Sequence, residues 1–136
     1  MSRTILFDDS RIEGPEPDLP AWRVQKGSAY VFVYVTPHEE DNVLRVIAPV
    51  LQIAPGTDER PLFRHLLELN AGEVAGAAFG VREDQVVLRA ERSTLDLDPS
   101  EVTDMIRRVE NFADKYDDVL VARFGGKAAG PSSTPL

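Results

Sequence analysis

The sequence predicts an α+β fold, an antiparallel sheet of β-hairpins with two helices in the order β-β-α-β-β-α. Two observations support this class. Two segments, residues 57–71 and 96–115, repeat apolar residues at helical spacing, and each follows a pair of short apolar runs separated by a polar turn. Hairpins that alternate with single helices place both helices on one face of an antiparallel sheet.

The first predicted hairpin spans residues 21–55. Its first strand region, AWRVQKGSAYVFVYVTP, contains a tight turn or a bulge at residues 26–28, and VLRVIAPVLQIAP follows after a polar turn. Pro49 has no N–H to donate and marks a sheet edge or a bulge. Both faces of the first strand are apolar, so both are expected to be covered. The alternating sets are Val31, Val33 and Val35 on one side, and Tyr30, Phe32 and Tyr34 on the other.

The two predicted helices carry clear end signals. Thr57 or Asp58 can cap the first, and Asn70-Ala71-Gly72 can end it, with Gly72 in a left-handed conformation. In the second, Asp98 fits the cap and Glu101 the third position of a capping box. The second helix should bury one continuous apolar face. That face consists of Val102, Met105, Ile106, Val109, Phe112, Ala113 and Tyr116.

Small residues are concentrated between the first helix and the second hairpin, in NAGEVAGAAFG. We interpret them as the means by which the strand GAAFGV approaches a helix closely. The turn REDQ and the strand VVLRAERS complete this hairpin. We therefore predict an irregular N-terminal segment over residues 1–20, a single α+β domain over 21–124 and a disordered tail over 125–136.

Composition excludes several functions. The chain has no cysteine, which rules out disulfides, thiolate metal sites and a cysteine nucleophile. Its net charge of −8 disfavours nucleic acid as a partner. The longest apolar run, AYVFVYV, is too short to span a membrane, and the N-terminus lacks a secretory signal. We expect a cytoplasmic protein with no membrane partner.

The sequence shows no motif for catalysis or cofactor binding. His38 leads HEED, a possible metal cluster, but a solvated turn explains it better, and His65 lies beside the apolar stripe of the first helix. The segment FGGK lacks the spacing of a phosphate loop. Arginine supplies twelve of the fifteen basic residues, which we interpret as codon bias. We predict no catalytic residue, no cofactor and no metal.

Three segments carry a family resemblance: LLELNAGEVAGAAFGV, VVLRAE and LDLDPSEVTDMIRRVENFADKYDDVL. They resemble the type III secretion class I chaperone and YbjN superfamily, with its LL-x-x-N helix end, its h-x-h-G strand and its long amphipathic C-terminal helix. The resemblance covers about residues 61–120 and implies a non-enzymatic, protein-binding homodimer. The family usually opens with an amphipathic helix that helps to form the cargo surface. Residues 1–20 do not show that helix.

We therefore expect a dimeric protein-binding module that binds a protein partner or secreted cargo through sheet and helix surfaces. The alternatives are a regulatory or structural dimer without cargo and a small-ligand-binding domain. The resemblance implies dimer contacts through residues 62–69 and 77–81. Residues 1–20 could instead fold back over the open face of the sheet. The candidate dimer or partner surface consists of Tyr30, Phe32, Tyr34, Phe63, Leu66, Leu67 and Phe79.

Overall fold

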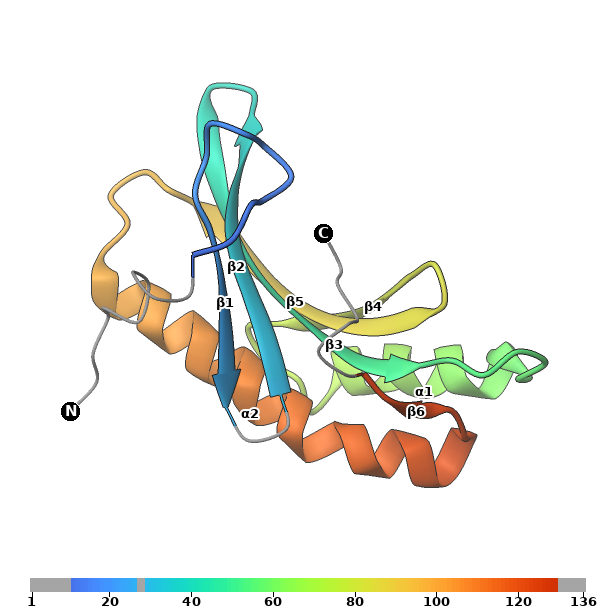
Figure 1. The fold of residues 1–136 in the computed structure, drawn as a ribbon. Coiled ribbons are helices and arrows are strands. Elements are labelled where there is room, and N and C mark those ends of the chain that lie inside the picture. Colours follow the sequence, from blue (N-terminus) through green and yellow to red (C-terminus); the bar gives the residue numbers. More distant parts are fainter. Residues whose placement is uncertain (1–10, 27–28, 130–136) are drawn as a thin grey trace.

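The computed structural model of the protein describes residues 11–26 and 29–129. Six antiparallel strands form one sheet, with two helices on one of its faces (Figure 1). The predicted α+β class is confirmed. The elements are β1 (Ala21–Lys26), β2 (Ala29–His38), β3 (Asp41–Gln52), α1 (Glu59–Ala71), β4 (Ala78–Arg82), β5 (Gln85–Ser93), α2 (Pro99–Phe124) and β6 (Lys127–Ala128).

The strands are arranged in the order β1-β2-β3-β5-β4, and β6 pairs with the end of β3. The predicted order omitted β1 and β6. The first strand region is two strands, because the chain reverses after Lys26 and pairs β1 with β2 along its whole length. Pro49 lies at an irregularity in the β3–β5 register. It therefore marks a bulge and not a sheet edge.

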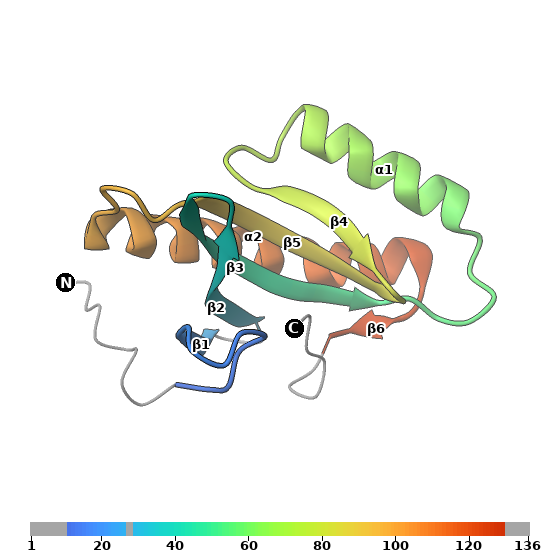
Figure 2. The same ribbon diagram turned by 90° about the horizontal axis from the view of Figure 1, so that it is seen from above.

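The molecule has three layers, which Figure 2 shows from above. Both helices lie on one face of the sheet, where α2 crosses β2, β3 and β5 and α1 runs beside β4. Residues 11–20, which we call the strap, lie on the opposite face, which we call the outer face. The strap is held by a hydrogen bond from the Ile12 N–H to the Ala21 carbonyl (2.9 Å).

The capping box of α2 is confirmed. The Asp98 side chain accepts from the Ser100 N–H (3.1 Å), and the Glu101 side chain accepts from the Asp98 N–H (3.0 Å). The helix runs to Phe124, so the segment YDDVLVARF, which the sequence allowed either to end the helix or to form a short extended piece, ends the helix. It does so because Tyr116 and Leu120, one turn apart, extend the buried stripe.

Apolar side chains on the two faces of β2 go into two separate clusters. Val31 and Val33 join the main core beneath the helices, together with side chains from every strand from β2 to β5. Phe32 and Tyr34 face the other way and are 4% and 6% exposed. This outer cluster comprises Ala21, Phe32, Tyr34, Ile47 and Val87, with Ile12 and Tyr30 packed against it. The expectation that both faces are covered is thus met within one chain.

The strap packs closely on β1. A Cβ at Gly14 would lie 2.7 Å from the Cβ of Ala21, so only glycine permits this approach. The strap therefore accounts for part of the cover that the sequence led us to expect from a second chain. No helix within the described residues has the length and apolar composition needed to cross a membrane.

The start of the predicted disordered tail is ordered. Gly125 and Gly126 both have positive φ and turn the chain back onto the sheet, where Lys127–Ala128 pairs with Leu51 and Gln52 of β3. A Cβ at Gly126 would lie 2.3 Å from the Gln52 carbonyl oxygen, so this docking requires glycine. Residues 130–136, and residues 1–10 of the predicted N-terminal segment, lie outside the described residues.

Two interpretations of the small residues were wrong. Gly72 has φ −123° and is not left-handed; the positive φ belongs to Gly76. The small side chains of β4 also do not face α1, because Phe79 takes that side and alternation directs Ala78 and Gly80 to the outer face. A Cβ at Gly80 would meet Val87, a member of the outer cluster, at 3.9 Å.

Candidate functional site

The candidate site is a groove on the outer face, built by the register of four strands. Tyr34 of β2 lies opposite Arg45 of β3, and Ile47 of β3 lies opposite Arg89 of β5. Arg89 in turn lies opposite Ala78 of β4. Outward positions of neighbouring strands thus bring arginines from separate parts of the sequence beside an apolar floor.

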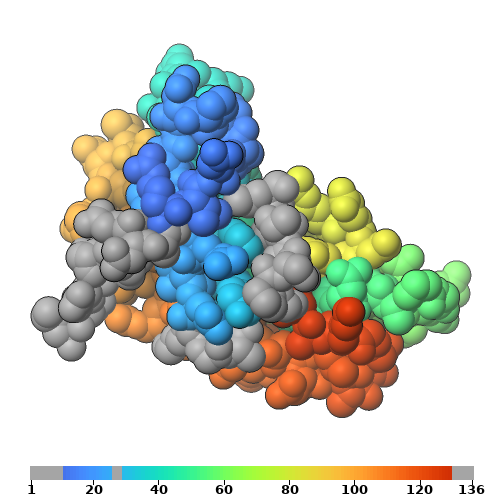
Figure 3. Space-filling view, in the orientation of Figure 1, coloured from blue at the N-terminus to red at the C-terminus, as the bar shows by residue number. Residues whose placement is uncertain are grey.

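Two adjoining hollows make up this groove, with volumes of about 500 Å³ and 370 Å³. They share Tyr34, Arg82 and Arg89, and together they extend from the strap to β4. Figure 3 looks onto the outer face, with the strap in blue near the top and the β4–β5 hairpin in yellow at the right. Further lining residues include Pro15, Glu16, Thr36, Arg45, Ile47, Ala78, Gly80 and Val87.

The guanidinium groups outnumber the carboxylates that could neutralise them. Arg45 pairs with Glu91 and also donates to Thr36 Oγ1 at 3.2 Å. Arg89 approaches the same carboxylate at 3.9 Å. Arg82 forms no ion pair with any residue that the structure describes. One carboxylate on the sheet is therefore shared by two of the three arginines.

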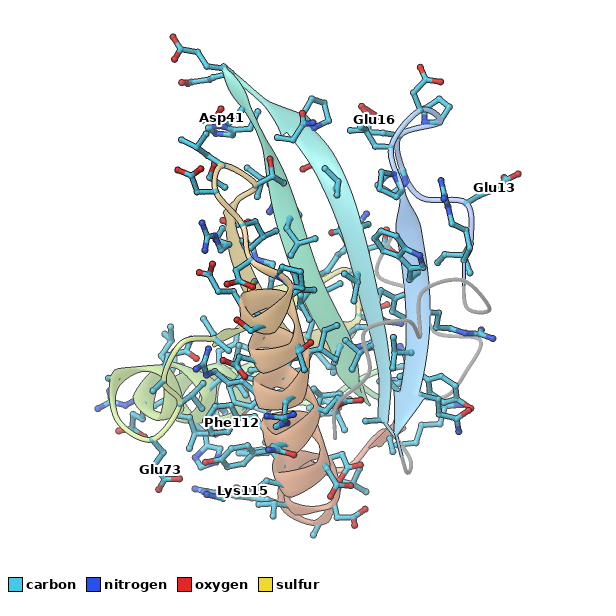
Figure 4. All side chains as sticks on the ribbon, turned by 90° about the vertical axis from the view of Figure 1, so that its left-hand side faces the viewer. Glu13, Glu16, Asp41, Glu73, Phe112 and Lys115 are labelled. Carbon is cyan, nitrogen blue, oxygen red and sulfur yellow. The ribbon has the colours of Figure 1, made fainter. Side chains whose placement is uncertain are left out.

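The strap forms the opposite rim and supplies Glu16, the one acidic residue among the described residues that line the groove. Figure 4 views the molecule from the side and shows Glu13 and Glu16 on the strap, with α2 on the opposite face of the sheet. The groove is thus bounded by arginines on the sheet and by a proline-rich acidic segment.

On its β4 side the groove reaches down to the strand backbone, because Ala78 and Gly80 project little or no side chain there. Gly80 does not have a positive φ, and only Val87 lies near its Cβ position. Small outward residues on a strand permit close approach of another chain to the sheet. The backbone could therefore accept a larger side chain at Gly80, but that side chain would fill the groove.

Both edges of the sheet are partly occupied by the chain itself. On β4, the Asn70 carboxamide accepts from the Phe79 N–H (2.7 Å) and donates to the Phe79 carbonyl (3.1 Å). On β1, Arg11 forms a bridge with Trp22, and its neighbour Ile12 donates to Ala21. An edge strand without such partners would be a template for another strand.

The family model for TY-Chap1, described as T3SS (YopN, CesT) and YbjN peptide-binding chaperone 1, matches residues 18–131, most of the chain. The protein belongs to the TY-Chap1 family. The resemblance to secretion chaperones and YbjN proteins, first noted over residues 61–120, is thus confirmed over a longer stretch. The comparison with curated proteins gives no match.

Eight chains of solved structures match this TY-Chap1 fold. One of them is the "Crystal Structure of the ExsC-ExsE Complex", with a TM-score of 0.58 and 18% sequence identity. The match covers 74% of this chain and 76% of that one. At this identity the likeness establishes the fold.

The TY-Chap1 fold separates the seven residues that we proposed as a partner surface. Phe32 and Tyr34 lie in the outer cluster with Tyr30 packed against it. Leu66 and Phe79 are buried in the main core beneath the helices, where they stabilise the fold. On α1, Phe63 is half-buried and Leu67 is 67% exposed. Tyr34 and Phe79 are the members of this set that line the groove, although the Phe79 side chain belongs to the main core.

Other polar groups of the TY-Chap1 fold lie away from the groove. His65 contacts Arg123 (3.2 Å) and the ring of Phe124. The Tyr116 hydroxyl donates to Glu73 (2.6 Å); burial, and then this carboxylate, raise the pKa of Tyr116 to about 12. No group of three or more potential metal-binding side chains occurs within residues 11–26 and 29–129.

Sequence reasoning missed the three arginines of the groove, because the arginine excess was interpreted as codon bias. Arg45, Arg82 and Arg89 come from three strands, and no linear motif joins them. The signal that could have found two of them is local. Gly80 and Val87 pair across the second hairpin, and Arg82 and Arg89 each follow one member of this pair by two residues, so alternation places both on the outer face.

Proposed function

We propose that the protein is a non-enzymatic, chaperone-type binding protein that holds an extended peptide segment of a partner protein in the outer-face groove. The groove is the observation that carries this proposal, because it combines an apolar floor with polar groups at its rim, as ligand sites do. The family description, which names peptide-binding chaperones, supports it.

The dimensions of the groove suit an extended chain. It crosses from β2 to β4, which is three strand spacings or about 14 Å. About four extended residues cover that distance. Side chains of a peptide laid across the floor would contact Tyr34, Ile47 and Val87, while polar groups would meet the arginines at the rim.

Selection from a random peptide display library tests this function, with Gly80→Leu as the blocking variant. The added side chain should fill the groove and leave the fold intact, because Gly80 is exposed and its φ is not positive. The matched control is Ala122→Leu, an exposed position on α2. Peptides selected on the wild type should bind the control and lose binding to Gly80→Leu.

Two results would reject the proposal. If no peptide is enriched on the wild type, peptide binding fails. If the enriched peptides bind Gly80→Leu as well as the wild type, they bind elsewhere. Circular dichroism of both variants should show wild-type secondary structure, which separates a filled groove from a misfolded protein.

A homodimer is a second part of the proposal, and exposed apolar residues of α1 favour it. Leu67 is 67% exposed, and Phe63 lies one turn away on the same side of the helix. Val81, on the adjoining strand, is 43% exposed. A two-fold contact through one self-complementary patch would cover these side chains.

Sedimentation equilibrium tests the dimer. The wild type should sediment with about twice the chain mass of 15.0 kDa, and Leu67→Glu should sediment as a monomer. Leu95→Glu is the matched control, because Leu95 is similarly exposed but lies in the loop before α2. A wild-type mass near that of one chain would contradict the dimer. We further propose a cytoplasmic location, since a chain without cysteine suits a reducing compartment.

A further inference from the structure

We infer that the peptide segment held by the groove is acidic, and that it lies across the outer face rather than adding a strand to a sheet edge. This inference rests on the proposed function and specifies its partner. Two independent observations carry it. They are the excess of arginines over carboxylates in the groove and the partial occupation of both sheet edges by the chain itself.

The charge of the groove is opposite to that of the whole chain. The described lining residues include three arginines and one acid, in a protein of net charge −8. Acidic side chains are exposed on α2, on the opposite side of the sheet, at Asp104, Asp114 and Asp118. The arginine side of the groove is therefore where a negatively charged segment meets attraction instead of repulsion.

Arginine at these positions is suited to carboxylates in particular. A guanidinium presents a planar array of N–H donors that matches a carboxylate with two parallel hydrogen bonds. Arg82 has no ionic partner among the described residues, and Arg89 shares Glu91 with Arg45 at the longer distance of 3.9 Å. Arg82 and Arg89 are thus the groups available to a ligand.

The apolar floor determines how the acidic residues must be spaced. Tyr34, Ile47 and Val87 lie beside the arginines, so apolar side chains of the segment should alternate with acidic ones. An extended chain directs successive side chains to opposite sides, which permits this alternation. A nucleic acid strand offers phosphates but no such apolar side chains.

The edges of the sheet are poor docking sites by comparison. Asn70 occupies the N–H and carbonyl of Phe79, in the five-residue strand β4. Strap residues occupy the start of β1. A strand added to β4 would have to displace the Asn70 carboxamide, whereas a chain lying across the face displaces none of these hydrogen bonds.

Fluorescence anisotropy with two labelled peptides tests the charge. One alternates Glu and Val over about ten residues, and the other replaces each Glu with Gln, which keeps the shape and removes the charge. The full-length wild type should bind the Glu peptide at least tenfold more tightly, a difference of about 1.4 kcal/mol. Added salt should weaken the binding of the Glu peptide and leave that of the Gln peptide nearly unchanged.

Charge reversal locates the contact. Arg82→Glu and Arg89→Glu should each remove the preference for Glu over Gln. Arg107→Glu, an exposed arginine of α2, makes the same change of charge and should keep the preference. If all three variants reduce it equally, the preference reflects overall charge and the inference fails.

A peptide scan with N-methylated backbone amides tests the mode of binding. Methylation removes one N–H donor at a time, so an added strand would lose affinity at every second residue. A peptide across the face should show no such alternation. An alternating loss would overturn the inference, as would binding of a single-stranded oligonucleotide to the groove more tightly than the Glu peptide.

These outcomes separate the inference from the proposed function. If the Gln peptide binds as well as the Glu peptide and Gly80→Leu abolishes both, the groove binds peptides without regard to charge. The inference is then wrong and the proposed function stands. If Gly80→Leu abolishes neither, both are wrong.

Discussion

The side chain of Asn70, at the end of α1, makes two hydrogen bonds to the backbone of Phe79 in β4: it accepts from the N–H at 2.7 Å and donates to the carbonyl at 3.1 Å. The pair of bonds fixes the helix to the edge strand. It also explains why asparagine follows the leucines in LLELN, since only a carboxamide both donates and accepts in this geometry.

Replacement of Asn70 by alanine should destabilise the protein by about 1–3 kcal/mol, because two partly buried backbone groups lose their partners. Aspartate keeps the hydrogen bond from the Phe79 N–H and loses the one to the Phe79 carbonyl. Asn70→Asp should therefore lower the free energy of unfolding less than Asn70→Ala if the bond from the N–H is the stronger of the two. Chemical denaturation measures both. Asn111→Ala, at an exposed position of α2, is the control and should leave stability nearly unchanged. Equal stability of Asn70→Ala and the control would contradict this role.

Gly125 and Gly126 offer a matched pair of substitutions at the turn into β6. Both have positive φ, but a Cβ at Gly125 meets nothing within 4 Å, whereas one at Gly126 meets the Gln52 carbonyl at 2.3 Å. Gly126→Ala should therefore detach β6 from β3, while Gly125→Ala should add only backbone strain of about 1–3 kcal/mol. Hydrogen exchange at the Ala129 amide, which donates to the Val50 carbonyl (3.3 Å), reports the detachment. Retained protection in Gly126→Ala would contradict it.

The buried face of α2 allows a graded test of packing. From the sequence we expected Phe112 to lie in the core, but it is half-buried and stacks on Tyr116 at the rim, whereas Leu120 is fully buried. Leu120→Ala should cost about 2–5 kcal/mol and Phe112→Ala less. Val119→Ala, at a half-exposed position, should stay within about 0.5 kcal/mol of the wild type. A larger loss at Phe112 than at Leu120 would contradict this packing.

The Tyr116–Glu73 contact should make stability fall in alkaline solution. The native pKa of Tyr116, about 12, lies above the ordinary value of 10.0, so between these values the unfolded chain releases a proton that the folded protein retains. The stability that this proton contributes is complete below pH 10 and is lost as the pH rises to 12. Between pH 10 and pH 12 the free energy of unfolding should fall by about 1.4 kcal/mol for each pH unit. Tyr116→Phe should flatten this part of the stability profile, and an unchanged slope would contradict the assigned pKa.

Local features could be predicted from the sequence, and features that depend on register could not. The capping box of Asp98 and Glu101 and the second hairpin were predicted correctly because their signals lie within a few residues. The strap was foreseen only as the alternative in which residues 1–20 fold back over the sheet. The strand β6 was not predicted, because a single glycine, Gly126, permits its close contact with the distant Gln52. The groove was missed because its three arginines lie together only after three strands are aligned.

Because its two rims come from distant parts of the sequence, the groove can form only late in the synthesis of the chain. One rim, at Pro15 and Glu16, is synthesised well before the other, at Arg82 and Arg89. The strap therefore leaves the ribosome well before its opposite rim exists. A nascent chain has no binding site to offer until β5 has been translated and has paired with β3, so the protein should engage a client only late in its own synthesis.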